Sequence, residues 1–256
     1  MKNKTLKRKL KKLENTLGTW VTIGNQAIVE ILAQAGQFDW LTIDLEHTVI
    51  DLNEMQILIG FIQSYDIAAL VRVSKNDEVA IKHALDSGAD GIIVPMISSA
   101  EDARRAVGYA KYPPLGIRGV GLNRAQKYGF GFDGYRKWME ESLVVIAQIE
   151  HIDAVNNIDE ILSVEGIDGI FIGPYDLSCS LGVPGQFDSE NVSEALKTVE
   201  VAAKKHSVSL GYHIIEPDGS LINKRYEMGY NFIAFATDFL FMGKKVTEEL
   251  DKRIST

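Results

Sequence analysis

Short apolar, β-branched runs alternate along the chain with stretches in which apolar residues recur at helical spacing. Continuous apolar runs are typical of parallel strands buried on both faces, and the amphipathic stretches between them predict helices that cover the sheet. Three of these helices are expected at Gln26–Ala35, Asp77–Ser87 and Asn191–His206. The expected strands are Gly18–Ile23, Trp40–Glu46, Ala68–Val73, Gly91–Met96, Leu143–Glu150, Gly169–Pro174, Leu210–Ile215 and Asn231–Thr237. Strand–helix units in this number fit a closed (β/α)8 barrel better than an open doubly wound sheet, so the pattern predicts an α/β fold of the TIM-barrel type.

Two segments stand outside this alternation. Within residues 1–16, leucines recur at helical spacing between lysines, which predicts an amphipathic helix with a solvated basic face. These leucines are Leu6, Leu10, Leu13 and, just beyond, Leu17. Residues 111–138, after an expected helix at Ser98–Ala110, form a long irregular segment rich in glycine, proline and aromatic residues. Such insertions are usually lids, binding loops or subunit contacts. Neither segment resembles a linker, so we expect one domain over residues 1–256.

Length, charge and cysteine content narrow the class of protein. The chain of 256 residues has the usual size of one α/β barrel. Its formal net charge of −8 argues against a nucleic-acid ligand, which needs a basic footprint. The single cysteine, Cys179, excludes an internal disulfide, fits a reducing cytosol, and is expected to be a small buried side chain. There is no signal-peptide pattern and no transmembrane run, so we expect a cytoplasmic protein that binds no membrane.

Polar side chains collect where three of the expected strands end. Residues 43–48 (Ile-Asp-Leu-Glu-His-Thr) end the second strand, residues 148–150 (Gln-Ile-Glu) end the fifth, and residues 173–176 (Gly-Pro-Tyr-Asp) follow the sixth. A parallel barrel brings the carboxyl ends of its strands to one mouth, where catalytic residues lie. The chain is therefore expected to be an enzyme. Its mouth should collect Asp44, Glu46, His47, Glu150 and Asp176.

Glu150 and Asp176 follow adjacent expected strands, so both carboxylates should face the same mouth. Two hard oxygen ligands without a nearby cysteine suit Mg²⁺ or Mn²⁺, with water and substrate in the remaining positions. In the structural alternative, Glu150 pairs with an arginine and Asp176 caps a helix, because Asp-Leu-Ser is a reasonable N-cap sequence. These two residues alone leave both alternatives open.

Arg72 and His47 are the other candidates at strand ends. An arginine at the end of the third strand could grip a substrate carboxylate through two parallel hydrogen bonds. It could equally form a structural ion pair with Asp44 or Glu46 on the neighbouring strand. Histidine gains and loses a proton near neutral pH, so His47 could carry a proton in catalysis, although a lone histidine is more often structural.

Two absences narrow the chemistry further. No lysine stands at the carboxyl end of an expected strand, and the nearest, Lys75, already belongs to a loop. Schiff-base catalysis is therefore disfavoured. The last two strands are not followed by a glycine-rich phosphate pocket, which makes phosphosugar substrates a poor fit.

A set of ordered motifs extends over essentially the whole chain, from Gly18 to Phe235. They are Asp44-x-Glu46-His47, Val94-Pro95-Met96, Pro114-x-Gly116-x-Arg118-Gly119-Val120-Gly121, Gln148-x-Glu150 and Phe171-Ile172-Gly173-Pro174-x-Asp176-Leu177-Ser178. Together they resemble the HpcH/HpaI family of metal-dependent (class II) pyruvate aldolases. The resemblance implies a (β/α)8 barrel of the phosphoenolpyruvate/pyruvate type. It also implies a carbon–carbon lyase that cleaves a 4-hydroxy-2-oxo acid to pyruvate and an aldehyde through a metal-stabilised enolate.

The resemblance also assigns roles to individual residues. Glu150 and Asp176 would hold Mg²⁺, Mn²⁺ or Co²⁺, His47 would be the general base, and Arg72 would hold the pyruvate carboxylate and stabilise the enolate. Asp86 matches an aspartate that raises the basicity of the histidine, within a subunit or across a subunit boundary. The implied substrate-binding residues are Arg72, Gln148, Gly173, Pro174, Tyr175 and Asp176, with Trp20, Asp44 and Glu46 as secondary candidates.

Two positions depart from the family's pattern. Tyr175 stands where a small residue is common, and residues 48–50 (Thr-Val-Ile) replace a glycine or alanine followed by proline. Both border the aldehyde side of the pocket, so the acceptor aldehyde stays open. The resemblance further implies a homo-oligomer, a hexamer built as a trimer of dimers that exchange the last helix.

Three alternatives to the aldolase share parts of this pattern. A CoA-thioester lyase of the citrate lyase β or malyl-CoA type should offer a basic entrance for nucleotide phosphates. Arg104, Arg105 and Lys111 are candidates for it, although they also fit a solvated helix face. An oxaloacetate decarboxylase would use the same enolate site. A catalytically silent barrel that only binds a 2-oxo acid is the third alternative.

Overall fold

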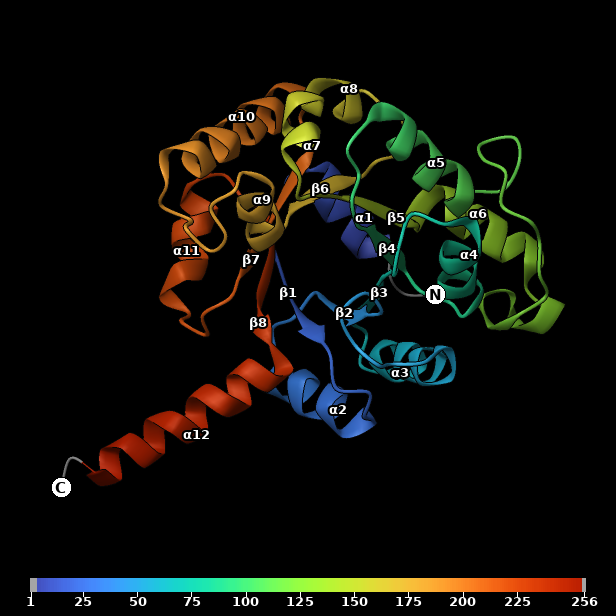
Figure 1. Ribbon diagram of the computed structural model, residues 1–256. Coiled ribbons are helices and arrows are strands. Elements are labelled where there is room, and N and C mark those ends of the chain that lie inside the picture. Colours follow the sequence, from blue (N-terminus) through green and yellow to red (C-terminus); the bar gives the residue numbers. More distant parts are fainter. Residues whose placement is uncertain (1–3, 255–256) are drawn as a thin grey trace.

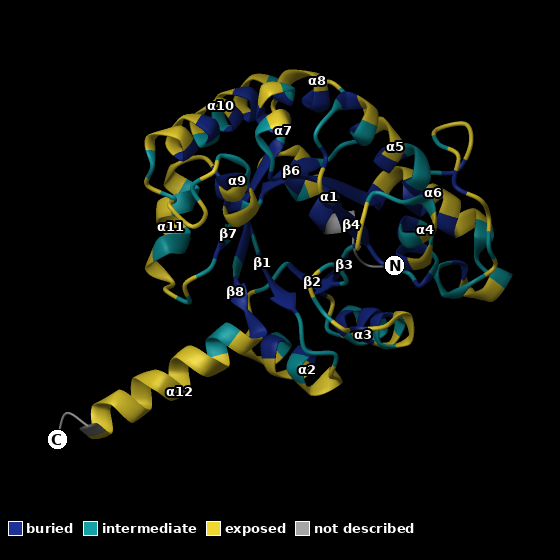
Figure 2. Ribbon diagram, viewed as in Figure 1, coloured by how far each residue is buried: buried dark blue, intermediate teal, exposed yellow. Residues whose placement is uncertain are grey.

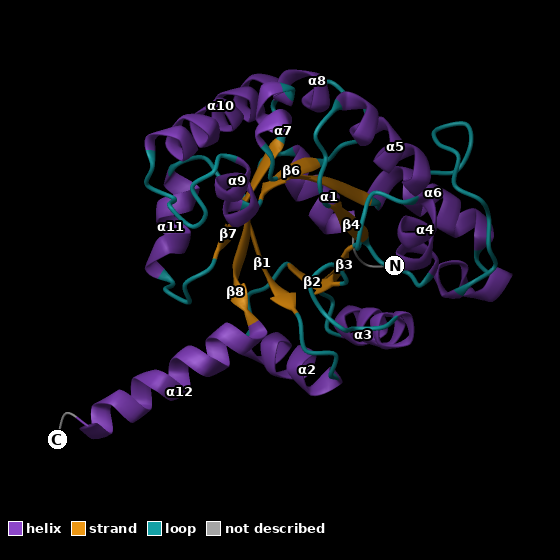
Figure 3. Cartoon of the chain, in the orientation of Figure 1, coloured by secondary structure: helices purple, strands orange, loops and turns teal. Residues whose placement is uncertain are grey.

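The computed structural model describes residues 4–254, which form a closed barrel of eight parallel strands in chain order (Figures 1 and 3). Each strand pairs with its neighbours in the chain, and the last strand pairs with the first. The strands are β1 (Thr16–Val21), β2 (Trp40–Asp44), β3 (Ala68–Arg72), β4 (Gly91–Val94), β5 (Val144–Ile149), β6 (Gly169–Ile172), β7 (Ser209–Ile214) and β8 (Phe232–Thr237). The predicted α/β barrel is confirmed.

Helices follow the strands and surround the barrel (Figure 1). They are α2 (Gln26–Ala35), α3 (Leu52–Ser64), α4 (Glu78–Asp86), α5 (Ala100–Ala110), α6 (Phe132–Ser142), α7 (Ile152–Asn156), α8 (Ile158–Leu162), α9 (Pro174–Ser180), α10 (Glu190–His206), α11 (Ser220–Glu227) and α12 (Asp238–Ile254). A helix α1 (Lys4–Lys11) precedes β1, and a 3₁₀ helix η1 (Arg124–Gly129) precedes α6. None of the helices within the described residues is long and apolar enough to cross a membrane.

Polar residues just after the strands fix where the first helices begin. The Asn25 side chain accepts from the backbone N–H of Ala27 at the start of α2, and the Asp77 side chain caps α4 in the same way. Asp51 and Glu54 form a reciprocal capping box at α3. Because these caps set where each helix starts, they also set the loops that line the mouth of the barrel.

The core has two parts, one between strands and helices and one inside the barrel. Inside, the ring of Trp40 stacks on Phe232 with centroids 4.3 Å apart. Gly18 is required beside them, because a Cβ there would lie 2.0 Å from the Trp40 ring. Leu6 and Leu10 of α1 belong to this inner cluster, so α1 closes the amino end of the barrel. Figure 2 shows the strands and the inner helix faces buried.

The expectation for the first helix was wrong in two respects. The helix ends at Lys11, so Leu13 lies beyond it and Leu17 belongs to β1; residues 1–3 lie outside the described part. Its basic face is also not wholly solvated. Lys7 is buried, and its Nζ donates to the Leu143 carbonyl at 2.6 Å and to Asp168 at 3.0 Å. Burial lowers the Lys7 pKa, and these partners at the amino end of the barrel compensate the charge.

The long segment before β5 is less irregular than expected, because α6 occupies its end. Glycine and aromatic residues obscured the helical spacing of Tyr135, Trp138 and Met139, all of which are buried. Seven of the expected strands extended one or two residues too far at the mouth, past the last ladder hydrogen bond, whereas the eighth was predicted to end at Thr237, where β8 ends. Cys179, expected to be buried, is exposed on α9.

Candidate active site

The carboxyl ends of β2, β3, β5 and β6 bring the predicted polar residues to one mouth. Asp44 and Arg72 are the last residues of β2 and β3 and lie opposite each other in the register of the sheet. Glu150 directly follows β5, and α9 begins directly after Gly173, which follows β6. The strand-end prediction therefore placed these residues in the right part of the barrel.

Arg72 is fixed at the mouth by two carboxylates and one aromatic ring. Its Nε and Nη2 donate to the two Asp44 carboxylate oxygens at 2.9 and 2.7 Å. Its Nη1 lies 3.3 Å from Glu46 Oε2, and the guanidinium lies 4.3 Å from the centre of the Trp20 ring. The bidentate pair and the cation–π contact hold the guanidinium plane in one orientation.

The structural alternative for Arg72, an ion pair with the neighbouring strand, is thus present. This ion pair does not use all the hydrogen-bond donors of Arg72, because a guanidinium has five N–H donors and the Asp44 pair uses two of them. Burial opposes ionisation of Asp44, but the hydrogen bonds and charge of Arg72 outweigh it and lower the Asp44 pKa. The pair is therefore ionised at neutral pH, and the remaining donors of Arg72 suit an anionic substrate.

Asp44 also shapes the turn that carries the histidine. Its Oδ1 accepts from the backbone N–H of Glu46 at 2.9 Å and of His47 at 3.4 Å, and its carbonyl accepts from the Thr48 hydroxyl at 2.5 Å. The same carboxylate therefore fixes both Arg72 and the backbone of residues 44–48. The His47 side chain is 60% exposed, with Nε2 3.7 Å from Glu46 Oε2. It stands at the rim, where a proton carrier can reach substrate.

The carboxylates of the mouth carry more negative charge than the chain itself compensates. Burial raises the pKa of Glu46 to about 7, and the charges of Glu150, Asp44 and Asp176 add to this effect against Arg72. Burial also raises the pKa of Glu150. Within the described residues, Glu46 Oε2 and Gln148 Oε1 are buried acceptors without a hydrogen-bond donor. A site of this kind favours a cation.

Glu150 is held in place from two sides and left open on a third. Its Oε1 accepts from the backbone N–H of Met96 at 2.7 Å, and its Oε2 accepts from the Gln148 amide. A Cβ on Gly173 would lie 2.9 Å from Glu150 Oε2, so glycine keeps this side of the carboxylate free. The structural alternative, an ion pair of Glu150 with an arginine, is not among the contacts of the described residues.

Asp176 lies in the first turn of α9, whose N-cap is Gly173 with Pro174 at the first helical position. Asp176 is therefore not the N-cap residue of the structural alternative. Its side chain is exposed toward solvent, and its charge acts on both Glu46 and Glu150. Both predicted ligands therefore stand at the carboxyl ends of adjacent strands, at the same mouth.

Glu150 and Asp176 fit a divalent cation by their chemistry. Hard carboxylate oxygens, surplus negative charge and unsatisfied buried acceptors are what Mg²⁺ or Mn²⁺ would complement. No group of three or more His, Cys, Asp or Glu side chains within the described part of the chain is arranged to hold a metal ion. The protein would thus supply two ligands and leave positions for substrate and water.

Tyr175 lies at the rim beside these residues. Its side chain is half exposed, and its ring meets that of Phe187 edge to face with centroids 4.9 Å apart. Phe187 belongs to the loop between α9 and α10. The contact with Phe187 holds this bulky ring at a position where a small residue is common in the family, so its effect on the aldehyde side of the pocket stays a prediction.

Asp86 is the predicted residue that does not lie at the mouth. It ends α4, which runs from the mouth toward the amino ends of the strands; soon after it, the Asp90 N–H donates to the Ala69 carbonyl near the start of β3. Asp86 pairs with Arg118 at 2.5 Å. A role for Asp86 beside His47 in the same subunit is therefore not supported by the structure, and a role across a subunit boundary stays a prediction.

His213 stands near the end of an expected strand but had no role assigned from the sequence; in the structure it lies on β7, under the mouth. Its ring tilts against Trp20 with centroids 5.7 Å apart, and Nε2 lies 3.3 Å from the Ala236 carbonyl. Burial and the nearby Arg72 lower the His213 pKa to about 4, so the ring is neutral in the floor of the site. Trp20, a secondary candidate, connects this floor to Arg72.

A (β/α)8 barrel whose mouth combines an oriented arginine with several carboxylates is the architecture of an enzyme that acts on small molecules. The model of the HpcH/HpaI aldolase/citrate lyase family matches residues 16–240, and the chain belongs to this family. The predicted membership of this family is therefore confirmed.

Named relatives and solved structures agree with this membership. The chain is 36% identical over 242 residues to a 2-dehydro-3,6-dideoxy-6-sulfogluconate aldolase of Pseudomonas putida, covering 94% of this chain and 93% of the relative. It is 34% identical over 250 residues to a 2-keto-3-deoxy-L-rhamnonate aldolase of Salmonella typhi, covering 97% and 91%. The crystal structure of an HpcH/HpaI aldolase/citrate lyase family protein from Burkholderia cenocepacia J2315 superposes with a TM-score of 0.91 at 30% identity, covering 97% and 98%.

Proposed function

We propose that this aldolase uses a divalent metal ion to cleave a 4-hydroxy-2-oxo acid to pyruvate and an aldehyde. The aldolase class follows from the family and from the names of the relatives. The observation that carries the finer proposal is the mouth itself, where Arg72 has donors beyond the two that bind Asp44 and lies close to Glu46, and where Asp44, Glu46, Glu150 and Asp176 act on one another by their charges. The names of both relatives describe 2-oxo-3-deoxy acids, which supports the proposed substrate class.

Glu150 and Asp176 are the residues proposed to hold the ion, and the Gln148 amide orients Glu150. When bound, such an ion supplies Lewis-acid chemistry to the keto oxygen of the substrate. Gly173 and Pro174 add little side-chain bulk beside the proposed ion. Their backbone is proposed to face the substrate, together with Tyr175. The family as a whole generally depends on divalent metals; Mg²⁺, Mn²⁺ and Co²⁺ are the proposed ions.

Arg72 is proposed to bind the substrate carboxylate and to stabilise the negative charge of the enolate. Its plane is already fixed by Asp44 and by the Trp20 ring, so little reorganisation is needed during the reaction. His213, which lies against the Trp20 ring, is neutral, so it adds no positive charge that would compete with Arg72 for the substrate carboxylate. Preorganised donors of this kind act most strongly in a site shielded from water.

His47 is proposed to remove the proton from the substrate's 4-hydroxyl group. The C4 oxygen then forms a carbonyl, the C3–C4 bond breaks, and its electron pair moves to C3 to give the pyruvate enolate. Transfer of the proton back to C3 completes pyruvate, and the aldehyde leaves. His47 stands at the exposed rim on a turn fixed by Asp44, a position suited to this transfer.

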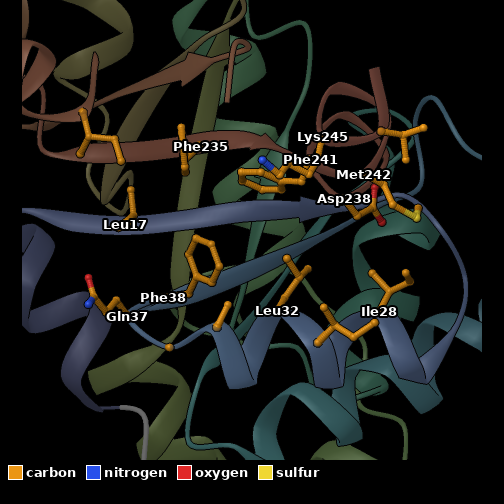
Figure 4. A pocket seen from close by; sticks show the side chains of 15 residues that line it. Leu17, Ile28, Leu32, Gln37, Phe38, Phe235, Asp238, Phe241, Met242 and Lys245 are labelled. Atoms are coloured by element: carbon orange, nitrogen blue, oxygen red, sulfur yellow. The ribbon is translucent and has the colours of Figure 1, made fainter. Parts of the chain in front are cut away.

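A second copy of the chain is proposed to complete the active enzyme. Helix α12 extends away from the barrel (Figure 1), and most of its residues are exposed (Figure 2). Beside its first turns lies a pocket of about 650 Å³ between α2, β8 and α12 (Figure 4). Its lining is mainly apolar, with Leu32, Phe38, Phe235, Phe241 and Met242 among the side chains. An exchanged α12 would cover such a surface, which supports the proposed dimers; the hexamer built from them is proposed from the family resemblance alone.

The ion pairs on α5 argue against the alternative, a CoA-thioester lyase. Arg104 pairs with Glu101 and Arg105 pairs with Asp102, both within the same helix. These arginines form a solvated helix face rather than a free basic entrance for nucleotide phosphates. A cytosolic location is also proposed, since the single cysteine fits a reducing compartment.

Pyruvate release tests the proposal. We expect 4-hydroxy-2-oxo acids to yield pyruvate, detected with lactate dehydrogenase, and EDTA to abolish the reaction until Mg²⁺, Mn²⁺ or Co²⁺ is added. Glu150→Ala should not be rescued at ordinary metal concentrations. Glu165→Ala, an exposed carboxylate that precedes β6 at the opposite end of the barrel, is the matched control and should behave as wild type. Full activity of the metal-stripped enzyme would overturn the metal proposal.

A further inference from the structure

The glycine-rich motif between α5 and α6 carries a buried arginine that holds Asp86. The Arg118 side chain is 0% exposed, and its Nη2 donates to Asp86 Oδ1 at 2.5 Å. Its Nη1 donates to the Tyr135 hydroxyl at 2.9 Å. That hydroxyl lies 3.5 Å from the carbonyl of Leu85, the residue next to Asp86. The network thus grips the end of α4 at both its side chain and its backbone.

The glycines of the motif are shaped around this network. A Cβ on Gly116 would lie 2.3 Å from the Lys111 carbonyl oxygen and 2.5 Å from that of Gly108, so no other residue fits there. The neighbouring backbone is pinned to the same two carbonyls, through the N–H of Ile117 at 2.8 Å and of Arg118 at 3.0 Å. The loop therefore has one path, and it directs Arg118 inward.

Gly121 of the same motif lies against the other oxygen of Asp86. A Cβ at Gly121 would come within 3.0 Å of Asp86 Oδ2. One carboxylate oxygen is therefore engaged by Arg118, while a residue without a side chain, Gly121, lies against the second. Asp86 itself is mostly buried, with a side chain 12% exposed. The motif fixes the carboxylate yet leaves one acceptor oxygen uncrowded.

A purely structural role would not call for this arrangement. A buried ion pair contributes little net stability relative to apolar residues of the same volume. The loop already has a second anchor, because Arg124 donates to the Ser87 carbonyl at 2.9 Å and to Gln63 Oε1 at 3.0 Å. Arg124 anchors the loop through neutral acceptors, whereas Arg118 binds a carboxylate, that of Asp86.

We propose that Arg118 is a positioning residue: with Tyr135, it fixes Asp86 Oδ1 so that Oδ2 is presented past Gly121 to the catalytic histidine of a second copy of the chain. The inference rests on the proposed function, with His47 as the base, and on the role across a subunit boundary that the family resemblance implies for Asp86. A carboxylate that accepts a hydrogen bond from an imidazolium favours the charged form of the histidine, but only at hydrogen-bonding geometry.

The test compares pH profiles of kcat/KM for metal-loaded Arg118→Lys, Asp86→Asn and the double variant. Arg118→Lys keeps the charge but loses the planar fork. We expect its plateau to fall roughly 10-fold, within the range seen for partners that orient catalytic groups. Its acidic limb should move to lower pH, as in Asp86→Asn, because the base is weakened. The double variant should be no worse than Asp86→Asn, since both changes remove one interaction.

Two further variants separate positioning from folding. Tyr135→Phe removes only the hydroxyl and should move the profile in the same direction by a smaller amount. Arg124→Lys disturbs the other anchor of the loop and should leave the acidic limb where it is. Multiplicative losses in the double variant, or equal shifts in Arg118→Lys and Arg124→Lys, would overturn the inference. A wild type that releases no pyruvate would instead refute the proposed function, and this inference with it.

Discussion

At the scale of single residues, the mouth contains more carboxylates than cationic side chains, and they are arranged around one arginine. Arg72 satisfies Asp44 and keeps its carboxylate ionised, while Glu46 and Glu150 stay difficult to ionise because they are buried among other carboxylates. A cation and an anionic substrate would relieve opposite sides of this imbalance. The ion pair that looks structural is therefore also what orients Arg72 for binding.

His47 gives the first prediction at this scale. His47→Ala should lower kcat by roughly 10²–10⁴-fold, the usual effect of losing acid–base help. Metal affinity, measured by calorimetry, should hardly change, because His47 is 60% exposed and is not among the proposed ligands. His83→Ala, an exposed histidine on α4, is the control. A His47→Ala protein that no longer bound metal would make the histidine a ligand and our role assignment wrong.

The residues that the sequence revealed are those that obey a positional rule. Asp44, Arg72 and Glu150 stand at or directly after the last residue of a strand, so the barrel topology alone predicted their common location. Asp86 ends a helix and was found only by resemblance. Arg118 stands in a quoted motif and His213 near the end of an expected strand, but the buried partners of Arg118 and the burial of His213 depend on residues distant in the chain, which no local pattern reports.

At the scale of elements, alternation of apolar runs predicted the strands because each is buried on both faces. It failed where tertiary contacts override composition. Lys7 is buried because its Nζ donates to a carbonyl and a carboxylate at the amino end of the barrel. Helix α6 forms despite the glycine at position 134. Helix boundaries and buried charges depend on partners distant in the chain, so the sequence left them undetermined.

Helix α12 gives a prediction at this scale. Val246 is 56% exposed and lines the apolar pocket, so in an isolated chain Val246→Asp should change stability little. If α12 exchanges between copies, the same charge would be buried in the interface and should lower the oligomer order in light scattering after size exclusion. Lys252→Ala, on the same helix, is the control. A wild type that is monomeric at micromolar concentration would contradict the exchange.

At the scale of the whole molecule, the barrel divides its two ends between stability and chemistry. Helix α1 fills the amino end with Leu6 and Leu10, while the carboxyl ends of the strands collect the charged side chains. The Asp86 network lies toward the closed end, away from the mouth of its own barrel. A complete site would then draw on two copies of the chain, which is why the oligomer belongs to the catalytic account.

The central claim, a mouth built to stabilise the pyruvate enolate, is tested most directly by exchange of the pyruvate methyl protons in D₂O. This reaction needs no aldehyde, so it is independent of the unknown acceptor. With Mg²⁺, the wild type should exchange the methyl protons well above the buffer rate, as followed by proton NMR. EDTA and Glu150→Ala should remove the exchange, and Arg72→Lys should slow it strongly, because the planar fork is lost. Exchange that persists in Glu150→Ala, or that is absent from a wild type that still releases pyruvate from 4-hydroxy-2-oxo acids, would contradict the enolate account.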